Sequence, residues 1–251
     1  MSRSTAALFL LLGSGLLACD KEPTKLENLA KSATAPAASS APAEAKPAVA
    51  RPPLVTVEDA AAMIDGDRID FATPDVKGQL ALALSGKKVE GETIAVIASR
   101  DVKMPKVANV VAALVAAKAK GVVIKTAKRD KSTAEIPLAM GAKREGCAAV
   151  GFIAKDGVIN AWPASGASAA RFSRGMAGPD ITRGSEGVRK QMASCDAPQW
   201  FVSADDGVTW GLVVDLVVAV QEPEDGGTPA KAKQVALLTK TAVPGRKIED
   251  E

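Results

Sequence analysis

The stretch QWFVSADDGVTWGLVVDLVVAVQ, residues 199–221, decides the fold class because its hydrophobic period changes in the middle. Residues 200–204 alternate between two faces as in a strand, whereas the apolar residues within 212–220 recur at helical spacing. Short polar residues and a glycine at 205–209 favour a turn between the two. A second apolar segment, QVALLT at 234–239, follows a loop rich in Gly and Pro, so we predict a strand, a turn, a helix and a strand.

A similar unit occurs earlier in the chain, at the offset of 106 residues that separates Ala98 from Ala204. This offset also pairs Val96 with Val202, Val102 with Val208, Met104 with Trp210, Val107 with Val213, and Asn109 with Asp215. Each copy ends in an apolar strand, GVVIKT at 121–126 and QVALLT at 234–239. We interpret the pattern as a diverged tandem repeat of two modules. The alternative is that any two units of this type share such a pattern.

Turn signals place further elements around these units. Asp65-Gly66 and Asp156-Gly157 each follow an apolar run and predict β-hairpins. Pro74-Asp75 and Pro105 predict helix starts, and a weaker helix is expected over residues 181–194 because it contains two glycines. An insertion rich in Ala, Ser and Gly, between Trp162 and Pro179, is expected to be a surface loop without a counterpart in the first copy.

The predicted fold class is therefore α+β, with two similar small ββαβαβ modules, each a sheet with helices packed on one face. The first module covers residues 54–127 and the second covers residues 146–243. Residues 128–145 are expected to be a connector that contains an edge strand near 135–140, and residues 244–251 a charged tail.

The second copy resembles the periplasmic domain of ExbD/TolR proteins, which are partners in proton-driven envelope machines. The resemblance is carried by an apolar strand running into SADDGV, by Trp210 five residues after Asp205, and by a Val/Leu helix followed by an apolar strand. It covers residues 147–239 and, more weakly, residues 57–126. The family has Tyr where this chain has Trp210.

The first copy has Ser99 and Met104 where the second has Asp205 and Trp210, so any role carried over from the family holds for the second copy only. The surface around Asp205, Asp206 and Trp210 is therefore the predicted binding site. Two alternatives remain for these residues. Adjacent Asp residues at a strand-to-helix turn commonly cap the helix, and a Trp at this position is commonly a core anchor.

The N-terminus carries the features of a lipoprotein signal. Arg3 precedes the apolar run AALFLLLGSGLLA at residues 6–18, which is too short to span a bilayer and ends directly before Cys19. Leu16-Leu17-Ala18-Cys19 resembles the bacterial lipobox, so residues 1–19 are predicted to be a signal peptide with lipidation at Cys19. The alternative is an ordinary cleaved signal with an incidental Cys. Residues 20–53, rich in Ala, Pro and Ser, are expected to be a disordered tether.

Composition narrows the function. The net charge is +3, with 32 basic and 29 acidic residues that are scattered along the chain, which argues against nucleic acid as the main partner. The chain has no His, the commonest general base and metal ligand, and it has no Gly-x-Ser-x-Gly, Walker-type or Cys-x-x-Cys motif. We therefore expect no catalytic residue, no cofactor and no metal site.

Once Cys19 is set aside, Cys147 and Cys195 remain as an even pair in an oxidising compartment. They open the second module and close its first helix, so we predict a disulfide between them. Two buried free thiols are the alternative.

The resemblance implies a non-enzymatic protein on the periplasmic face of a bacterial membrane, held by a lipid anchor. It further implies homodimerisation and binding of an envelope protein partner or of peptidoglycan, within a transport or energy-coupling system. No acidic residue lies within residues 6–18, so we expect no proton translocation by this chain. The alternatives are an enzyme that acts on peptidoglycan through Asp205 and Asp206, and a purely structural spacer.

Overall fold

The computed structural model describes residues 51–141, 145–176, 178–197, 199–222 and 234–248. The chain divides into two units, residues 1–47 and residues 48–251, and the described residues all belong to the second unit. The predicted signal peptide, the lipidation of Cys19 and nearly all of the predicted tether lie outside the described residues. None of the helices in the described part is long and apolar enough to cross a membrane.

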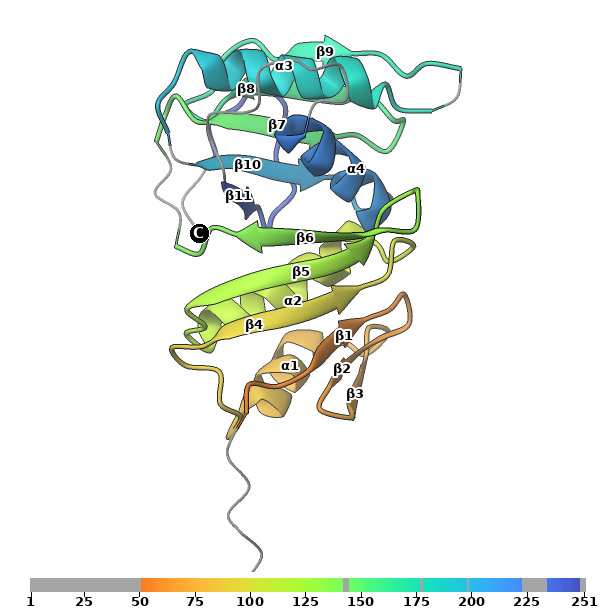
Figure 1. The fold of residues 1–251 in the computed structure, drawn as a ribbon, viewed down its shortest axis with the longest axis vertical. Coiled ribbons are helices and arrows are strands. Elements are labelled where there is room, and N and C mark those ends of the chain that lie inside the picture. The colour runs from red at the N-terminus through yellow and green to blue at the C-terminus, as the bar shows by residue number, and fades with distance from the viewer. Residues whose placement is uncertain (1–50, 142–144, 177, 198, 223–233, 249–251) are drawn as a thin grey trace, which may run out of the picture. The chain divides into compact units, whose positions relative to one another are not determined.

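The described residues form a mixed α+β fold with four helices and one sheet of eleven strands (Figure 1). The elements before residue 140 are β1 (Val55–Val57), β2 (Ala61–Ile64), β3 (Asp67–Asp70), α1 (Val76–Leu84), β4 (Thr93–Ala98), α2 (Met104–Ala116), β5 (Gly121–Ala127) and β6 (Thr133–Leu138). Those after it are β7 (Ala149–Ile153), β8 (Ile159–Pro163), β9 (Ala170–Phe172), α3 (Ile181–Ala193), β10 (Gln199–Ala204), α4 (Trp210–Gln221) and β11 (Gln234–Leu237).

The predicted α+β class is confirmed, but the prediction of a separate sheet for each module is not. The strand order is β3-β2-β1-β4-β5-β6-β11-β10-β7-β8-β9, so β1–β6 and β7–β11 occupy the two sides of one continuous sheet. We call these sides, together with their helices, the first and second halves. They join where β6, antiparallel to β5, pairs in parallel with β11 through Leu138 and Val235. The segment predicted to be an edge strand within a connector is thus an inner strand.

Local sequence signals account for the elements of the first half. Asp65 and Gly66 both have positive φ, 51° and 95°, and form the tight turn between β2 and β3. The Asp75 side chain accepts a hydrogen bond from the Gly78 amide and caps α1, as Pro74-Asp75 predicted. Pro105 occupies the first turn of α2, where its missing N–H leaves no bond unmade.

The second half contains the other predicted hairpin and one strand that was not expected. β7 and β8 are joined through a turn in which Gly157 has a φ of 81°. Part of the predicted surface loop after Trp162 is β9, which pairs with β8 just as β3 pairs with β2. The insertion therefore does have a counterpart in the order of the strands.

Two glycines in α3 mark close contact between this helix and the sheet. A Cβ atom at Gly184 would lie 2.6 Å from Ile159 Cδ1 and 3.0 Å from Ile159 Cβ, and one at Gly187 would lie 2.2 Å from the end of the Phe172 ring. These glycines disfavour a helix locally, but they allow α3 to approach β8 and β9.

One face of the sheet is covered by helices along its whole width. Buried residues from all four helices belong to a single hydrophobic cluster. Figure 1 shows α1 and α2 behind the strands but α3 and α4 in front, because neighbouring strands are rotated by roughly 20° each and the sheet turns over across its width. The halves therefore share one core.

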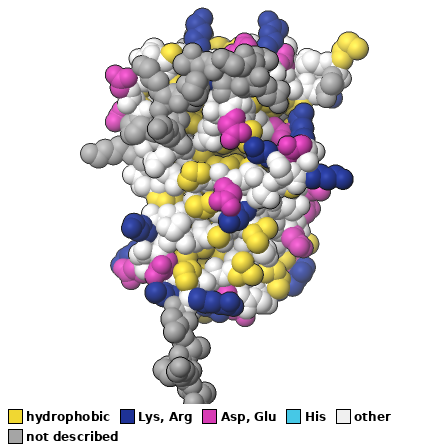
Figure 2. All heavy atoms as spheres, viewed as in Figure 1, with side chains coloured by type: hydrophobic (Ala, Val, Ile, Leu, Met, Phe, Trp, Pro, Cys, Tyr) yellow, Lys and Arg dark blue, Asp and Glu magenta, His cyan; other side chains and the backbone are white. Residues whose placement is uncertain are grey.

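The opposite face differs between the two halves. In the second half it is covered by a smaller hydrophobic cluster that includes Phe152, Phe201 and Ile248. The Trp162 indole donates to the Arg246 carbonyl at 2.9 Å, so residues up to Ile248, which include the start of the charged tail predicted over 244–251, pack on the sheet. In the first half this face is open, with Ile97 46% exposed, and Figure 2 shows hydrophobic side chains there between charged ones.

Candidate functional site

Asp205 and Asp206 follow β10 at the turn before α4. Asp205 is half-buried, and its Oδ2 accepts a hydrogen bond from the Lys155 amide at 2.8 Å, while its own amide donates to the Ile153 carbonyl at 2.9 Å. It thus fixes the β7–β8 turn. The N-cap of α4 is Thr209, so the interpretation of the two Asp residues as helix caps is wrong. Asp206 is exposed, within 3.4 Å of the Thr241 hydroxyl.

Trp210 is a core residue with no exposed surface. Its Nε1 donates to the Thr126 hydroxyl at 2.9 Å, and that hydroxyl donates to the Ala98 carbonyl at 3.0 Å. The ring therefore connects α4 to the first half and does not belong to the surface around Asp205 and Asp206. The proposed binding role of the two Asp residues remains a prediction.

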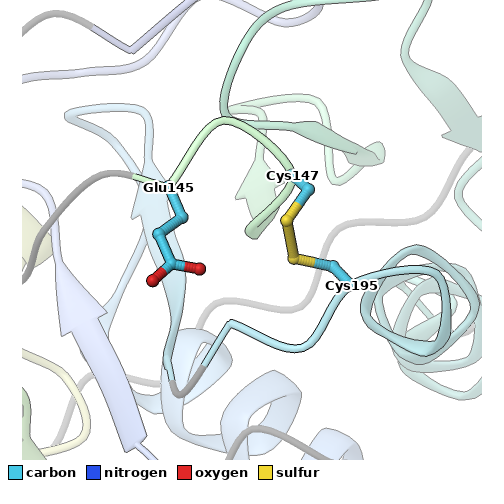
Figure 3. A group of neighbouring side chains, drawn as sticks. All are labelled: Glu145, Cys147 and Cys195. Atoms are coloured by element: carbon cyan, nitrogen blue, oxygen red, sulfur yellow. A yellow bond between two sulfur atoms is a disulfide. The ribbon is translucent and has the colours of Figure 1, made fainter.

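The predicted disulfide is present. Cys147 and Cys195 are joined, with their Cα atoms 5.6 Å apart, and Figure 3 shows the Glu145 carboxylate beside them. Among the described residues, these three side chains are the group of potential metal ligands that lie close enough together to share an ion. Both sulfurs are in the disulfide, so they offer no thiolate to a metal, and a lone exposed carboxylate is a poor site.

The turns before α2 and α4 pair with each other at the junction of the two halves. Lys103 and Thr209 form an isolated antiparallel bridge. The Met104 amide donates to the Val208 carbonyl at 2.9 Å, and the Trp210 amide donates to the Val102 carbonyl at 2.7 Å. Residues 102–104 match residues 208–210 at the offset of 106, so each segment makes the same two contacts with the other.

Beside this junction, one carboxylate binds two guanidinium groups. Asp215, in α4, has a side chain that is 10% exposed, and its two oxygens lie 2.9 and 2.8 Å from Arg100 Nη2. Arg129 Nε lies 2.8 Å from the same carboxylate. Arg100 also donates to the carbonyls of Ala127 and Gly211. Both arginines belong to the first half, so Asp215 ties the second half to it.

A cleft of about 350 Å³ opens next to Asp215, and we call it the junction cleft. Its walls are Lys128, Arg129 and Asp130 from the β5–β6 loop; Ile181, Thr182, Ser185 and Arg189 from α3; and Asp215, Val218, Ala219 and Glu222 from α4. Figure 2 shows charged side chains of both signs gathered where the β5–β6 loop meets α4.

Hydrogen bonds hold several of these cleft residues in place. The Arg189 guanidinium donates to the Ala219 carbonyl and lies 3.4 Å from the Ser185 hydroxyl. Lys128 pairs with Glu222 at 3.2 Å. The hydrogen bond from the Ser132 hydroxyl holds the pKa of the exposed Asp130 carboxyl below its ordinary value, so this group is ionised at neutral pH.

Reasoning from the sequence did not identify the junction cleft. Its charged residues come from the β5–β6 loop and two helices, and their proximity depends on the pairing of β6 with β11. One signal was present, because Asp215 is the only charged residue within the apolar run of residues 212–220. A buried charge in such a helix needs a partner from elsewhere in the fold.

Neither a family model nor a curated protein nor a solved structure matches this chain.

Proposed function

We propose that the chain is a non-enzymatic, lipid-anchored protein of the cell envelope, built from two ExbD/TolR-like modules that bind an envelope protein partner or peptidoglycan. It would act as an accessory or binding component of a transport or energy-coupling system, without translocating protons itself. The observation that supports the two-module part of the proposal is the reciprocal pairing of residues 102–104 with residues 208–210. Segments that match at the sequence offset also contact each other symmetrically.

The order of the elements supports two related modules. Along the chain, the same series of elements occurs twice, with β6 between the two copies. The first series is β1-β2-β3-α1-β4-α2-β5 and the second is β7-β8-β9-α3-β10-α4-β11. Across the sheet, β3-β2-β1-β4-β5 is matched in reverse by β11-β10-β7-β8-β9, and strands from the two series are not interleaved. The two series therefore run in opposite order across the sheet, and Lys103 and Thr209, which match at the offset of 106, pair with each other.

This arrangement resembles that of a two-fold dimer within one chain. In an isologous interface the same patch on each partner contacts its own copy, which is what residues 102–104 and 208–210 do. The resemblance to ExbD/TolR proteins implies homodimerisation, and we propose that the internal pair of modules takes the place of a dimer formed by this surface.

One Asp205 oxygen accepts a hydrogen bond from the Lys155 amide and so holds the β7–β8 turn, a role that needs no catalysis. The alternatives of an enzyme that acts on peptidoglycan and of a structural spacer are separated from our proposal by assay. Turnover of peptidoglycan that disappears in Asp205→Asn and Asp206→Asn while partner binding is retained would favour the enzyme.

The anchor is tested by labelling cells with a fatty acid analogue. We expect the wild type to be labelled and Cys19→Ser to be unlabelled. Equal labelling of the two would reject lipidation, and with it the proposed placement on the periplasmic face of a membrane.

Partner binding is tested by crosslinking in intact cells. We expect the double variant Asp205→Asn and Asp206→Asn to fold normally, because an Asn oxygen can also accept the hydrogen bond from the Lys155 amide, but to lose most of the crosslinked product. Asp101→Asn is the matched control, since Asp101 is an exposed acid in the corresponding turn of the first half. An unchanged crosslinking yield in the double variant would show that this turn is structural.

A further inference from the structure

Grooves lie at matching places in the two halves. One of about 450 Å³ lies between α1 and α2, and the junction cleft lies between α3 and α4. The α2 residues of the first groove are Asn109, Ala112, Ala113, Ala116 and Ala117, and the first four of them match Asp215, Val218, Ala219 and Glu222 of the junction cleft at the offset of 106. A helix pair of this kind therefore packs without the charges that the junction cleft contains.

The charged residues of the junction cleft are thus not required for a helix pair of this kind to pack. At the two positions that differ in charge, the first half has Asn109 and Ala116 where the second has Asp215 and Glu222. The junction cleft also has a third wall, the loop from Lys128 to Asp130, which belongs to the other half. Asp215 and Glu222 are paired with basic groups, and Glu222 and Arg129 are largely exposed, so packing does not require these charges. Their concentration at one of two matching grooves points to a role beyond packing.

Two guanidinium groups in the junction cleft, those of Arg129 and Arg189, are held in place without an acidic partner of their own among the described residues. Asp215 is shared between Arg100 and Arg129, so this triad carries one net positive charge. Arg129 uses its Nε for Asp215, and its side chain is 65% exposed at the cleft. Arg189 is fixed by a carbonyl and a hydroxyl, neither of which is charged. A guanidinium presents a planar fork of N–H donors that fits a carboxylate or a phosphate.

The remaining surface of the cleft favours a carboxylate with an apolar neighbour. Ile181, Val218 and Ala219 are half-buried residues in its lining. The volume of about 350 Å³ is near the lower end for small-molecule sites, so it suits a short group and not a long chain. Asp130 and Glu222 add negative charge at the rim, which would oppose the higher charge of a phosphate.

We propose that the junction cleft binds the carboxylate of a ligand whose adjoining group is small and apolar, with Arg129 and Arg189 as the anion-binding residues. A free acylated amino acid and the C-terminal residue of a peptide both have this chemistry. The proposal goes beyond the function proposed above, because it depends neither on the lipid anchor nor on Asp205 and Asp206.

The experiment is an NMR titration of the protein with N-acetylvaline, a tripeptide ending in Val, N-acetylvalinamide and inorganic phosphate. We expect saturable shifts of the amides of Thr182, Ser185 and Arg189 with both acids, and affinity about tenfold weaker for the amide, which cannot accept charge-assisted hydrogen bonds. Tighter binding of the tripeptide would identify a peptide terminus as the source of the carboxylate, and equal binding a small acid.

Matched variants distinguish binding at the junction cleft from a general effect of removing one positive charge from the protein. Arg129→Gln and Arg189→Gln should each weaken binding of N-acetylvaline by about tenfold. Lys77→Gln removes the same charge from the matching groove of the first half and should leave binding unchanged. Arg129 is largely exposed and Arg100 still pairs with Asp215, so the Arg129 variant should lose little stability and stay folded even if Arg189→Gln does not fold.

Several results would overturn the proposal. These are equal affinity for acid and amide, tighter binding of phosphate than of the acid, an equal loss of affinity in Lys77→Gln, and no saturable shift at about 10 mM acid, the range of weak complexes. A failure of fatty acid labelling or crosslinking would leave this titration unaffected, so the two proposals fail separately.

Discussion

The substitution Asp215→Asn removes one charge from the junction of the two halves while keeping the size of the side chain. Asn109 occupies the matching position of α2, so an Asn is compatible with a helix of this kind. The Asp215 side chain is 10% exposed and that of its partner Arg100 is 25% exposed, which places the ion pair between a surface pair and a buried one.

The expected loss of stability follows from the contacts that remain. Asn would keep one acceptor for Arg100, whose bonds to the Ala127 and Gly211 carbonyls would be intact, but Arg129 would lose its charged partner. Breaking a fully buried ion pair costs about 3–5 kcal/mol, whereas an exposed pair contributes up to about 1 kcal/mol. Because Arg100 is partly solvated, we expect the free energy of unfolding to fall by about 2 kcal/mol.

Urea denaturation of the oxidised protein measures this loss, and a double-mutant cycle assigns it. Arg100→Gln should be costly in the wild type but cost at least about 1 kcal/mol less in the Asp215→Asn background, since the pair is already broken there. Asp206→Asn, which removes an exposed charge, should change stability by at most about 0.5 kcal/mol. If Arg100→Gln has the same effect in both backgrounds, the ion pair does not hold the halves together.

Three further predictions concern the frame around the site. Gly184→Ala should lower the free energy of unfolding by about 1–2 kcal/mol despite the better helix propensity of Ala, because its Cβ would meet Ile159 near the backbone. Gly187→Ala should stay within about 0.5 kcal/mol, since the half-exposed Phe172 ring can move, and equal losses measured in urea would contradict the argument. Replacing Cys147 and Cys195 together by Ser should cost about 4 kcal/mol, the chain-entropy value for partners 48 residues apart, and an unchanged urea midpoint would contradict this. The hydrogen bond from Lys106 lowers the pKa of Asp59, so its contribution to stability is present above the ordinary pKa and is lost as the pH falls through the lowered one. In Lys106→Met the pKa of Asp59 should return towards its ordinary value in an NMR titration of the carboxyl group, and an unchanged midpoint would show that Lys106 is not the cause.

Local sequence signals predicted most of the individual elements. Both hairpins, all four helices and the disulfide follow from turn residues, capping residues, periodicity and Cys spacing. The two glycines of α3 correctly predicted a helix of low propensity, but the sequence did not show why glycine is needed at these positions. They lower helix propensity, as expected, but they are accommodated because the helix packs against β8 and β9 at a distance that a Cβ would prevent.

The junction was not predictable in the same way, because it depends on contacts between distant segments. The pairing of Leu138 with Val235 makes one sheet out of two, and nothing in either segment specifies the other. The cover on the second half comes from the segment that ends at Ile248, whose many polar and charged residues gave no sign of a buried role. The junction cleft was unpredictable for the same reason, since Arg129 and Asp215 are 86 residues apart and meet where the two halves join.

The proposed fusion of two modules would also explain how one groove can differ from the other. In a symmetric dimer of identical chains every substitution appears twice, so a charge introduced into one groove would appear in the other as well. Here Asp215 has Arg100 and Arg129 to balance it, whereas the residue that matches Arg100 at the offset of 106 is Asp206, so an acid at Asn109 would lack this basic partner. Two modules in one chain can diverge independently, so one groove can keep its alanines for packing while the other acquires paired charges and a binding role. On our interpretation, the asymmetry of the junction cleft is therefore a consequence of the covalent link between the modules.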